Sequence, residues 1–139
     1  MASDQHQMIC GLIVRKMKGQ GYTQLCGFDG AVRDGYFSEF PQPPQVGRHR
    51  PDCISYNPLT KKYAIGEAKT SADLSSDRTR EELIDFSDYC LANDNYDKVI
   101  FGFPSSSEKL VIKIMDKMKK ENRGRIELFV YFEEIDDDF

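Results

Sequence analysis

The spacing of apolar residues divides the chain into helices and strands. Apolar positions that recur every three to five residues predict amphipathic helices over 4–18 and 79–92, and a third helix that follows Ser105. Shorter apolar or alternating runs predict strands at 22–28, 52–57, 62–69, 98–103 and 126–132. The order helix, strand, strand, strand, helix, strand, helix, strand predicts an α/β fold with a mixed β-sheet core flanked by helices.

A β-hairpin organises the chain. Its turn lies between Asn57 and Lys62, where an Asn-Pro pair begins a polar loop of four residues. Pairing these two residues across the hairpin places Asp52 opposite Glu67. Side chains alternate faces along a strand, and cross-strand partners share a face. Asp52, Glu67 and Lys69 are therefore expected on one side of the hairpin.

The other face of the second hairpin strand carries only Ala64, Gly66 and Ala68. Residues this small would allow a helix or another backbone to approach closely. A helix and then a buried strand follow the hairpin, and this succession is typical of a βαβ crossover. The strand over 98–103 should therefore run parallel to the strand over 62–69.

Side-chain caps and apolar stripes define the expected helices. Two capping boxes are predicted, Thr79 with Glu82 and Ser105 with Glu108. The second helix should bury Leu83, Phe86 and Cys90. The third helix should carry Leu110, Val111, Ile114, Met115 and Met118 on one stripe and basic residues to position 123. The first helix should bury Met8, Ile9, Leu12, Ile13 and Met17.

Composition narrows the class of protein. A chain of 139 residues is expected to form one domain over 1–139, with 133–139 as an acidic tail. No apolar run has membrane-spanning length and no signal-peptide pattern opens the chain, so we expect a cytoplasmic protein with no membrane partner. The net charge is −4, but it becomes +1 without the five acids of the tail. Four separated cysteines indicate buried, reduced thiols: Cys10, Cys26, Cys53 and Cys90.

The residue types at the hairpin point to phosphodiester chemistry. Asp52 and Glu67 would repel each other unless a cation lies between them. Their hard oxygen ligands suit Mg²⁺, which commonly binds one or two carboxylates and keeps several waters. Lys69 would orient the attacking water and neutralise charge that develops on the phosphate. The alternative is a solvated surface hairpin with no site.

The same segment resembles a known family. Pro51-Asp52, a gap of fourteen residues, and then Glu67-Ala68-Lys69 look like the PD-(D/E)xK nuclease motif. The resemblance covers most of 4–103 and implies a restriction endonuclease-like core in the order αβββαβ. It also implies a catalytic set of Asp52, Glu67 and Lys69 that uses Mg²⁺ or Mn²⁺, with the Ala68 carbonyl as a third metal ligand.

The first helix departs from the family pattern. The family usually carries a metal-binding acid there, commonly Glu, and this helix has no Glu. The candidates near the start of the helix are Asp4, Gln5, His6 and Gln7. A glutamine such as Gln7 would hold a water bound to the metal, and Asp4 would reach the metal only if the end of the helix lies close. The departure puts a second metal in question and leaves Asp52 and Glu67 in place.

Four arginines are candidate phosphate contacts. Arg48 and Arg50 end the long segment 29–50, and segments of this length without a period are often functional. Arg78 and Arg80 lie near the start of the second helix, where phosphates bind well. Solvated arginines paired with nearby acids are an equal alternative for Arg78 and Arg80. Two aromatic residues of the long segment are expected to cover the core: Phe37 and Phe40.

The sequence is compatible with two functions. The first is a metal-dependent nuclease, with DNA favoured over RNA as substrate, that is structure-selective or depends on a protein partner or a homodimer. The second is a catalytically inactive nuclease-fold module for nucleic-acid binding or assembly. The intact set of Asp52, Glu67 and Lys69 favours the nuclease, whereas the altered first helix and the acidic tail favour the binding module.

Overall fold

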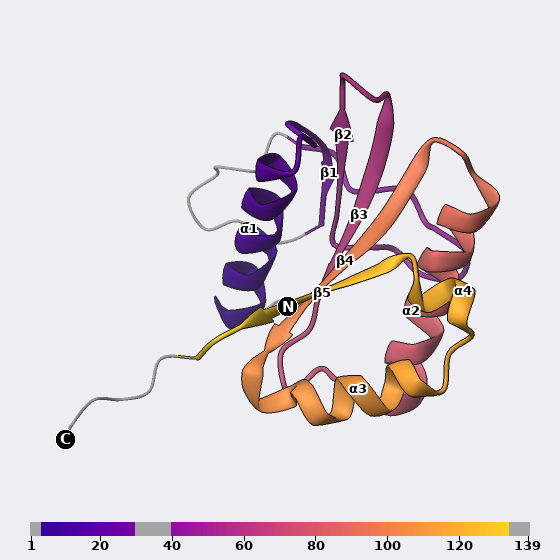
Figure 1. Ribbon diagram of the computed structural model, residues 1–139. Helices are drawn as coiled ribbons and strands as arrows, with labels where there is room; N and C mark the ends of the chain where they lie inside the picture. Colours follow the sequence, from indigo (N-terminus) through magenta and orange to yellow (C-terminus); the bar gives the residue numbers. More distant parts are fainter. Residues whose placement is uncertain (1–3, 30–39, 134–139) are drawn as a thin grey trace.

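The computed structural model describes residues 4–29 and 40–133, which form a five-stranded mixed sheet flanked by helices (Figure 1). The α/β fold class and the order of the predicted elements are confirmed. One short helix, α4, was not predicted. The elements in chain order are α1 (Asp4–Gly19), β1 (Gln24–Phe28), β2 (Cys53–Asn57), β3 (Lys62–Ala68), α2 (Ser76–Ala92), β4 (Tyr96–Pro104), a 3₁₀ turn (Ser105–Ser107), α3 (Glu108–Asp116), α4 (Lys120–Arg123) and β5 (Ile126–Tyr131).

The sheet has the strand order β1-β2-β3-β4-β5. Strand β2 pairs antiparallel with both β1 and β3, whereas β3, β4 and β5 run parallel to one another. Asn57 pairs with Lys62, so the predicted hairpin register is confirmed. The parallel pairing of β3 with β4 confirms the predicted crossover. The hairpin thus sets the pairing of β2 with β3, and the crossover sets the direction of β4 beside β3.

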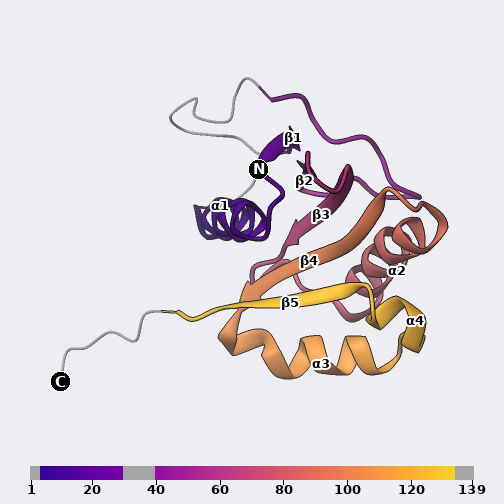
Figure 2. The same ribbon diagram turned by 45° about the horizontal axis from the view of Figure 1, so that its top comes forward.

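Helix α1 covers one face of the sheet, and α2, α3 and α4 cover the other (Figure 2). A Cβ atom built at Gly66 would lie 2.8 Å from Ile13 Cγ2 and 2.9 Å from Met17 Cε. The small residues of β3 therefore do admit a helix at close range, as predicted. Met8 was expected in the core of this face but is 45% exposed, because the buried stripe of α1 runs instead through Ile9, Cys10, Ile13 and Met17.

The second face holds the larger apolar cluster. Leu83, Phe86 and Cys90 of α2 are buried there, as predicted. They pack with Phe101 and Phe103 of β4 and with residues of α3. The two apolar clusters lie on opposite faces of the sheet, and the candidate site lies where the layers meet at the ends of β3 and α1.

Both predicted capping boxes are wrong. Helix α2 begins at Ser76, and Thr79 lies inside its first turn, where its N–H donates to Ser75 O (3.0 Å). Thr79 Oγ1 accepts the Ser75 N–H (3.2 Å), so the helix starts earlier than the sequence pattern indicated. No side-chain hydrogen bond caps α3, which follows the 3₁₀ turn directly. Glu82, the expected capping acid, is buried and has a different partner, described below.

Two further expectations need correction. The third helix does not continue to position 123, because Lys119 is extended and the separate helix α4 places Asn122 against Ser87 (Nδ2 to Oγ, 2.7 Å). Cys26 is exposed on the edge strand β1, although the other three cysteines are buried and all four are free. Phe40 packs against the cluster under α1, as expected. Two predictions lie outside the described residues: Phe37 and most of the acidic tail.

Candidate active site

Asp52 and Glu67 lie side by side where β2 begins and β3 ends. The pairing of Cys53 with Gly66 sets this register. The Asp52 N–H donates to Gly66 O (3.1 Å) and to Glu67 Oε1 (3.2 Å). The Ala68 N–H in turn donates to Asp52 Oδ2 (2.7 Å). Backbone pairing therefore holds both acids at one end of the central strands, as the hairpin register predicted.

The Glu67 carboxyl is almost inaccessible to water, with 3% of its side chain exposed. Burial raises its pKa well above the usual range, and the negative charge of Asp52 raises it further. Only the Lys69 ammonium opposes these effects among the principal causes. A carboxyl in this environment is stabilised in its ionised form by an added cation.

Lys69 lies just after β3, and its N–H donates to Gly102 O of β4 (3.0 Å). Its ammonium lies 2.9 Å from Glu82 Oε1 and 3.6 Å from Glu67 Oε2. Burial alone would lower the pKa of Lys69, but the two neighbouring carboxylates outweigh it and the pKa is raised. Lys69 is therefore held as a charged ammonium beside Glu67, and Glu82 is a neighbour that the sequence pattern did not identify.

His6 occupies the first-helix position of the site. Its Nε2 lies 3.3 Å from Asp52 Oδ2, and the hydrogen bond with Asp52 raises the pKa of His6 despite partial burial. Within the described residues, no hydrogen bond links Gln7 to either acid, so its role as a metal ligand stays a prediction. His6 was among the four candidates at the start of the first helix, and it precedes the buried residues Ile9 and Cys10 by three and four positions.

The arginines fall into two groups. Arg48 bonds to Asp85 through its guanidinium (Nη2 to Oδ1, 3.0 Å) and its backbone N–H (2.8 Å). Arg80 pairs with Asp77 (3.1 Å). These two arginines are engaged with α2 acids that do not belong to the site.

Arg78 and Arg50 lie closer to the acids. Arg78 Nε lies 3.9 Å from Glu82 Oε1, the same oxygen that pairs with Lys69. Arg50 donates to Gln42, which donates to Asp29 (3.1 Å), and the Asp29 N–H donates to Asp52 O (2.7 Å). Contact of any of the four arginines with substrate stays a prediction, but the structure connects only this pair to the acidic centre.

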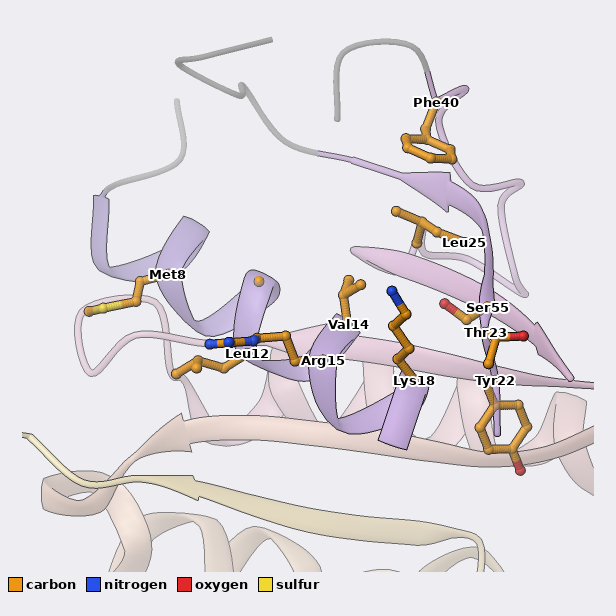
Figure 3. Close-up of a pocket in the computed structure, with 11 residues that line it drawn as sticks. Met8, Leu12, Val14, Arg15, Lys18, Tyr22, Thr23, Leu25, Phe40 and Ser55 are labelled. Atoms are coloured by element: carbon orange, nitrogen blue, oxygen red, sulfur yellow. The ribbon is translucent and has the colours of Figure 1, made fainter. Parts of the chain in front are cut away.

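A cleft of about 740 Å³ lies between α1 and β1 (Figure 3). Val14 and Lys18 lie on the side of α1 that faces β1. The cleft begins at Met8, two residues after His6. From there it runs along α1 to Lys18, away from the acids. Among the described residues, Arg15 and Lys18 form no ion pair. Further lining residues are Gly11, Leu12, Tyr22, Thr23, Leu25, Phe40 and Ser55.

The donor set fits a hard divalent cation. Asp52 and Glu67 offer carboxylate oxygens, the ligands that Mg²⁺ and Mn²⁺ prefer. The two carboxylates are held together and one of them is buried, so a bound cation would relieve the repulsion between them. The Ala68 N–H is engaged with Asp52, while a metal-binding role for its carbonyl stays a prediction.

Comparison with known proteins gives no relative. No family model, no curated protein and no solved structure matches the chain. Among the described residues, no helix is both long and apolar enough to cross a membrane. The geometry of the site is therefore the basis for assigning a function.

Proposed function

We propose that the protein is a metal-dependent nuclease of the PD-(D/E)xK type that hydrolyses phosphodiester bonds in nucleic acid. The observation that carries this proposal is the pairing of Asp52 with the buried Glu67, with Lys69 Nζ 3.6 Å from Glu67 Oε2. A helix, three antiparallel strands, a helix and a parallel strand surround the site in the order that the family resemblance implies. This arrangement supports a restriction endonuclease-like core.

Asp52 and Glu67 would hold the divalent cation, which is Mg²⁺ or Mn²⁺. When bound, the cation would neutralise the two carboxylates and polarise the phosphate and the attacking water. Glu67 is buried, and its Oε1 accepts the Asp52 N–H, so its side chain has little freedom to move. Asp52 is fixed by the Ala68 N–H and by His6.

Each acid of the pair has a basic neighbour, Lys69 beside Glu67 and His6 beside Asp52. The Lys69 ammonium would stabilise charge that develops on the phosphate, since it is held charged beside Glu67. His6 would hold Asp52 in place and is a positioning residue in this scheme. Arg50, Arg78 and the cations of the cleft along α1 would bind the nucleic-acid backbone, with DNA favoured over RNA.

One observation favours an inactive binding module instead. Lys69 is closer to Glu82 than to Glu67, 2.9 Å against 3.6 Å. A lysine that serves only to neutralise Glu82 would leave the fold intact without catalysing a reaction. The two functions differ in whether any substrate is cleaved.

The deciding experiment incubates the full chain with branched, duplex and single-stranded DNA and RNA in Mg²⁺, Mn²⁺ or EDTA. Cleavage of at least one substrate with metal, its loss in EDTA and its loss in Glu67→Gln would support the nuclease. Lys69→Met should also lose most of this cleavage. Lys109→Met is its matched control, because Lys109 is exposed on α3. Metal-independent binding without cleavage of any substrate would favour the binding module.

A further inference from the structure

His6, Cys10 and Asp52 form a second donor set beside the carboxylate pair. A ligand atom from each of the three residues lies within 4.8 Å of the other two. His6 and Cys10 are one helical turn apart on α1, and Asp52 reaches them from the position directly before β2. This set contains nitrogen and sulfur, unlike the oxygen pair formed by Asp52 and Glu67.

The two donor separations from His6 Nε2 are close to those of a tetrahedral transition-metal site. His6 Nε2 lies 3.3 Å from Asp52 Oδ2 and 3.9 Å from Cys10 Sγ. With ordinary zinc bond lengths, a tetrahedral site has edges of about 3.3 Å between nitrogen and oxygen and about 3.6 Å between nitrogen and sulfur. A cation could therefore enter with small side-chain movements. Cys10 is only 1% exposed, so the site is closed on its core side.

The chemistry of the set selects the cation. Thiolate and imidazole ligands bind Zn²⁺ and Co²⁺ well, whereas Mg²⁺ prefers oxygen ligands. Binding replaces the thiol proton of Cys10, which leaves to solvent as Zn²⁺ bonds to sulfur. Asp52 belongs to both sets, so its carboxylate cannot serve two different cations independently.

We propose that His6, Cys10 and Asp52 form a binding site for Zn²⁺, and that Zn²⁺ bound there inhibits the Mg²⁺-dependent reaction by withdrawing Asp52 from Glu67. The inhibitory part rests on the proposed nuclease function, but the binding part does not. The site makes the protein sensitive to the supply of thiophilic metal ions. Glu67 is not a ligand of Zn²⁺ in this proposal.

The binding test uses Co²⁺ as a spectroscopic probe on the metal-free full chain. Tetrahedral Co²⁺ bonded to a thiolate gives an intense charge-transfer absorption, which Zn²⁺ should abolish by displacement. We expect this absorption in the parent protein and its loss in Cys10→Ser. Cys53, a second buried thiol at the start of β2, is the control, and Cys53→Ser should keep the absorption. His6→Asn, which leaves the core thiol in place, should weaken Co²⁺ binding, and circular dichroism checks that each variant is folded.

Two results would overturn the site. One is the absence of thiolate absorption in the folded parent protein. The other is absorption that persists in Cys10→Ser, including the case in which only Cys53→Ser abolishes it. Zn²⁺ inhibition of Mg²⁺-dependent cleavage, relieved in Cys10→Ser, tests the regulatory part separately. Equal inhibition of both proteins would refute regulation through this site. A protein that cleaves nothing would refute the nuclease and regulation, while the Co²⁺ result would still decide the binding site.

Discussion

The Lys69 ammonium and the Glu82 carboxylate form a largely buried ion pair, with Nζ 2.9 Å from Oε1. The pair joins the end of β3 to the first half of α2. Glu82 is only 6% exposed, so its charge depends on Lys69 and on the more distant Arg78 for compensation. Lys69 therefore has two separable effects, one on the stability of the fold and one on the proposed reaction.

Lys69→Met should remove both effects. Cleavage should fall by about 100-fold or more, because the transition state loses a positioned charge. The free energy of unfolding should also fall, by about 3 kcal/mol, since Glu82 would remain buried without its closest cation. Metal affinity should stay similar or rise, because a like charge near the cation is lost. Cleavage assays, urea denaturation and calorimetry measure the three quantities.

The double variant Lys69→Met/Glu82→Gln separates these effects. Replacing the buried carboxylate by a neutral amide should recover most of the lost stability, because no charge is left uncompensated. Activity should remain low. If the double variant regained full Mg²⁺-dependent cleavage, Lys69 would act only by neutralising Glu82, and the proposed mechanism would be wrong.

Metal binding should depend on both carboxylates. Calorimetry with Mn²⁺ should show one binding event for the parent protein and its loss in Asp52→Ala and in Glu67→Gln. Asp116→Asn, an exposed acid on α3, is the control and should bind like the parent. Glu67→Gln should also be more thermally stable than the metal-free parent at neutral pH, because a buried carboxyl with a raised pKa is removed. Unchanged Mn²⁺ binding in both acid variants would exclude the proposed ligands.

Local rules explain why much of the fold was predictable. The Asn57–Lys62 turn fixes the hairpin register, and that register places Asp52 beside Glu67 without knowledge of the rest of the chain. The βαβ connection likewise fixes the direction of β4. Both inferences involve neighbours in the sequence, where turn chemistry and chain connectivity leave few alternatives.

Long-range contacts explain what was missed. His6 was one of four candidates on the first helix, but its contact with Asp52, 46 residues away, depends on how α1 lies along the sheet. Glu82 matched a capping pattern, but pairing with Lys69 placed it in the interior instead. Arg48 pairs with Asp85, 37 residues away, which the sequence pattern did not indicate, and its contact with phosphate stays a prediction. In each case the sequence shows the residue type and not the partner.

The arginines should differ in their effect on nucleic-acid binding. Arg50→Ala and Arg78→Ala should weaken binding and flatten its salt dependence, because each removes a cation near the acidic centre. Arg48→Ala and Arg80→Ala should leave the slope of log affinity against log salt nearly unchanged, since their guanidinium groups are paired on α2. Binding measured by fluorescence anisotropy over a salt series checks the difference. Equal slopes for all variants would remove these arginines from the interface.

The Arg48–Asp85 pair should contribute to stability in a pH-dependent way. Burial would raise the pKa of Asp85, but hydrogen bonds from the Arg48 guanidinium and N–H outweigh it and hold the pKa below the ordinary value of 3.8. The unfolded chain therefore binds more protons in this range than the folded protein. The stabilisation is present above 3.8 and is lost as the pH falls through the lowered pKa.

Arg48→Ala should accordingly lower the Tm at neutral pH, and its difference from the parent should shrink on acidification. Arg80→Ala is the matched control, because its partner Asp77 is 90% exposed and the pair should contribute little. Thermal melts over a pH series compare the two variants. A Tm difference for Arg48→Ala that is independent of pH would show that Asp85 is not the source of the effect.

Gly66→Ala should destabilise the junction between α1 and β3. The added methyl group would contact Cys53 Sγ, Ile13 Cγ2 (2.8 Å) and Met17 Cε (2.9 Å), and overpacking of this kind costs about 1–3 kcal/mol. Gly11→Ala is the control, because nothing lies within 4 Å of the added atom and alanine favours the helix by about 1 kcal/mol. Urea denaturation should therefore give opposite signs for the two variants. Gly66→Ala should also weaken Mn²⁺ binding, since displacement of α1 or β2 moves the groups around Glu67. If Gly66→Ala left the free energy of unfolding unchanged, the close packing of α1 against the sheet would be contradicted.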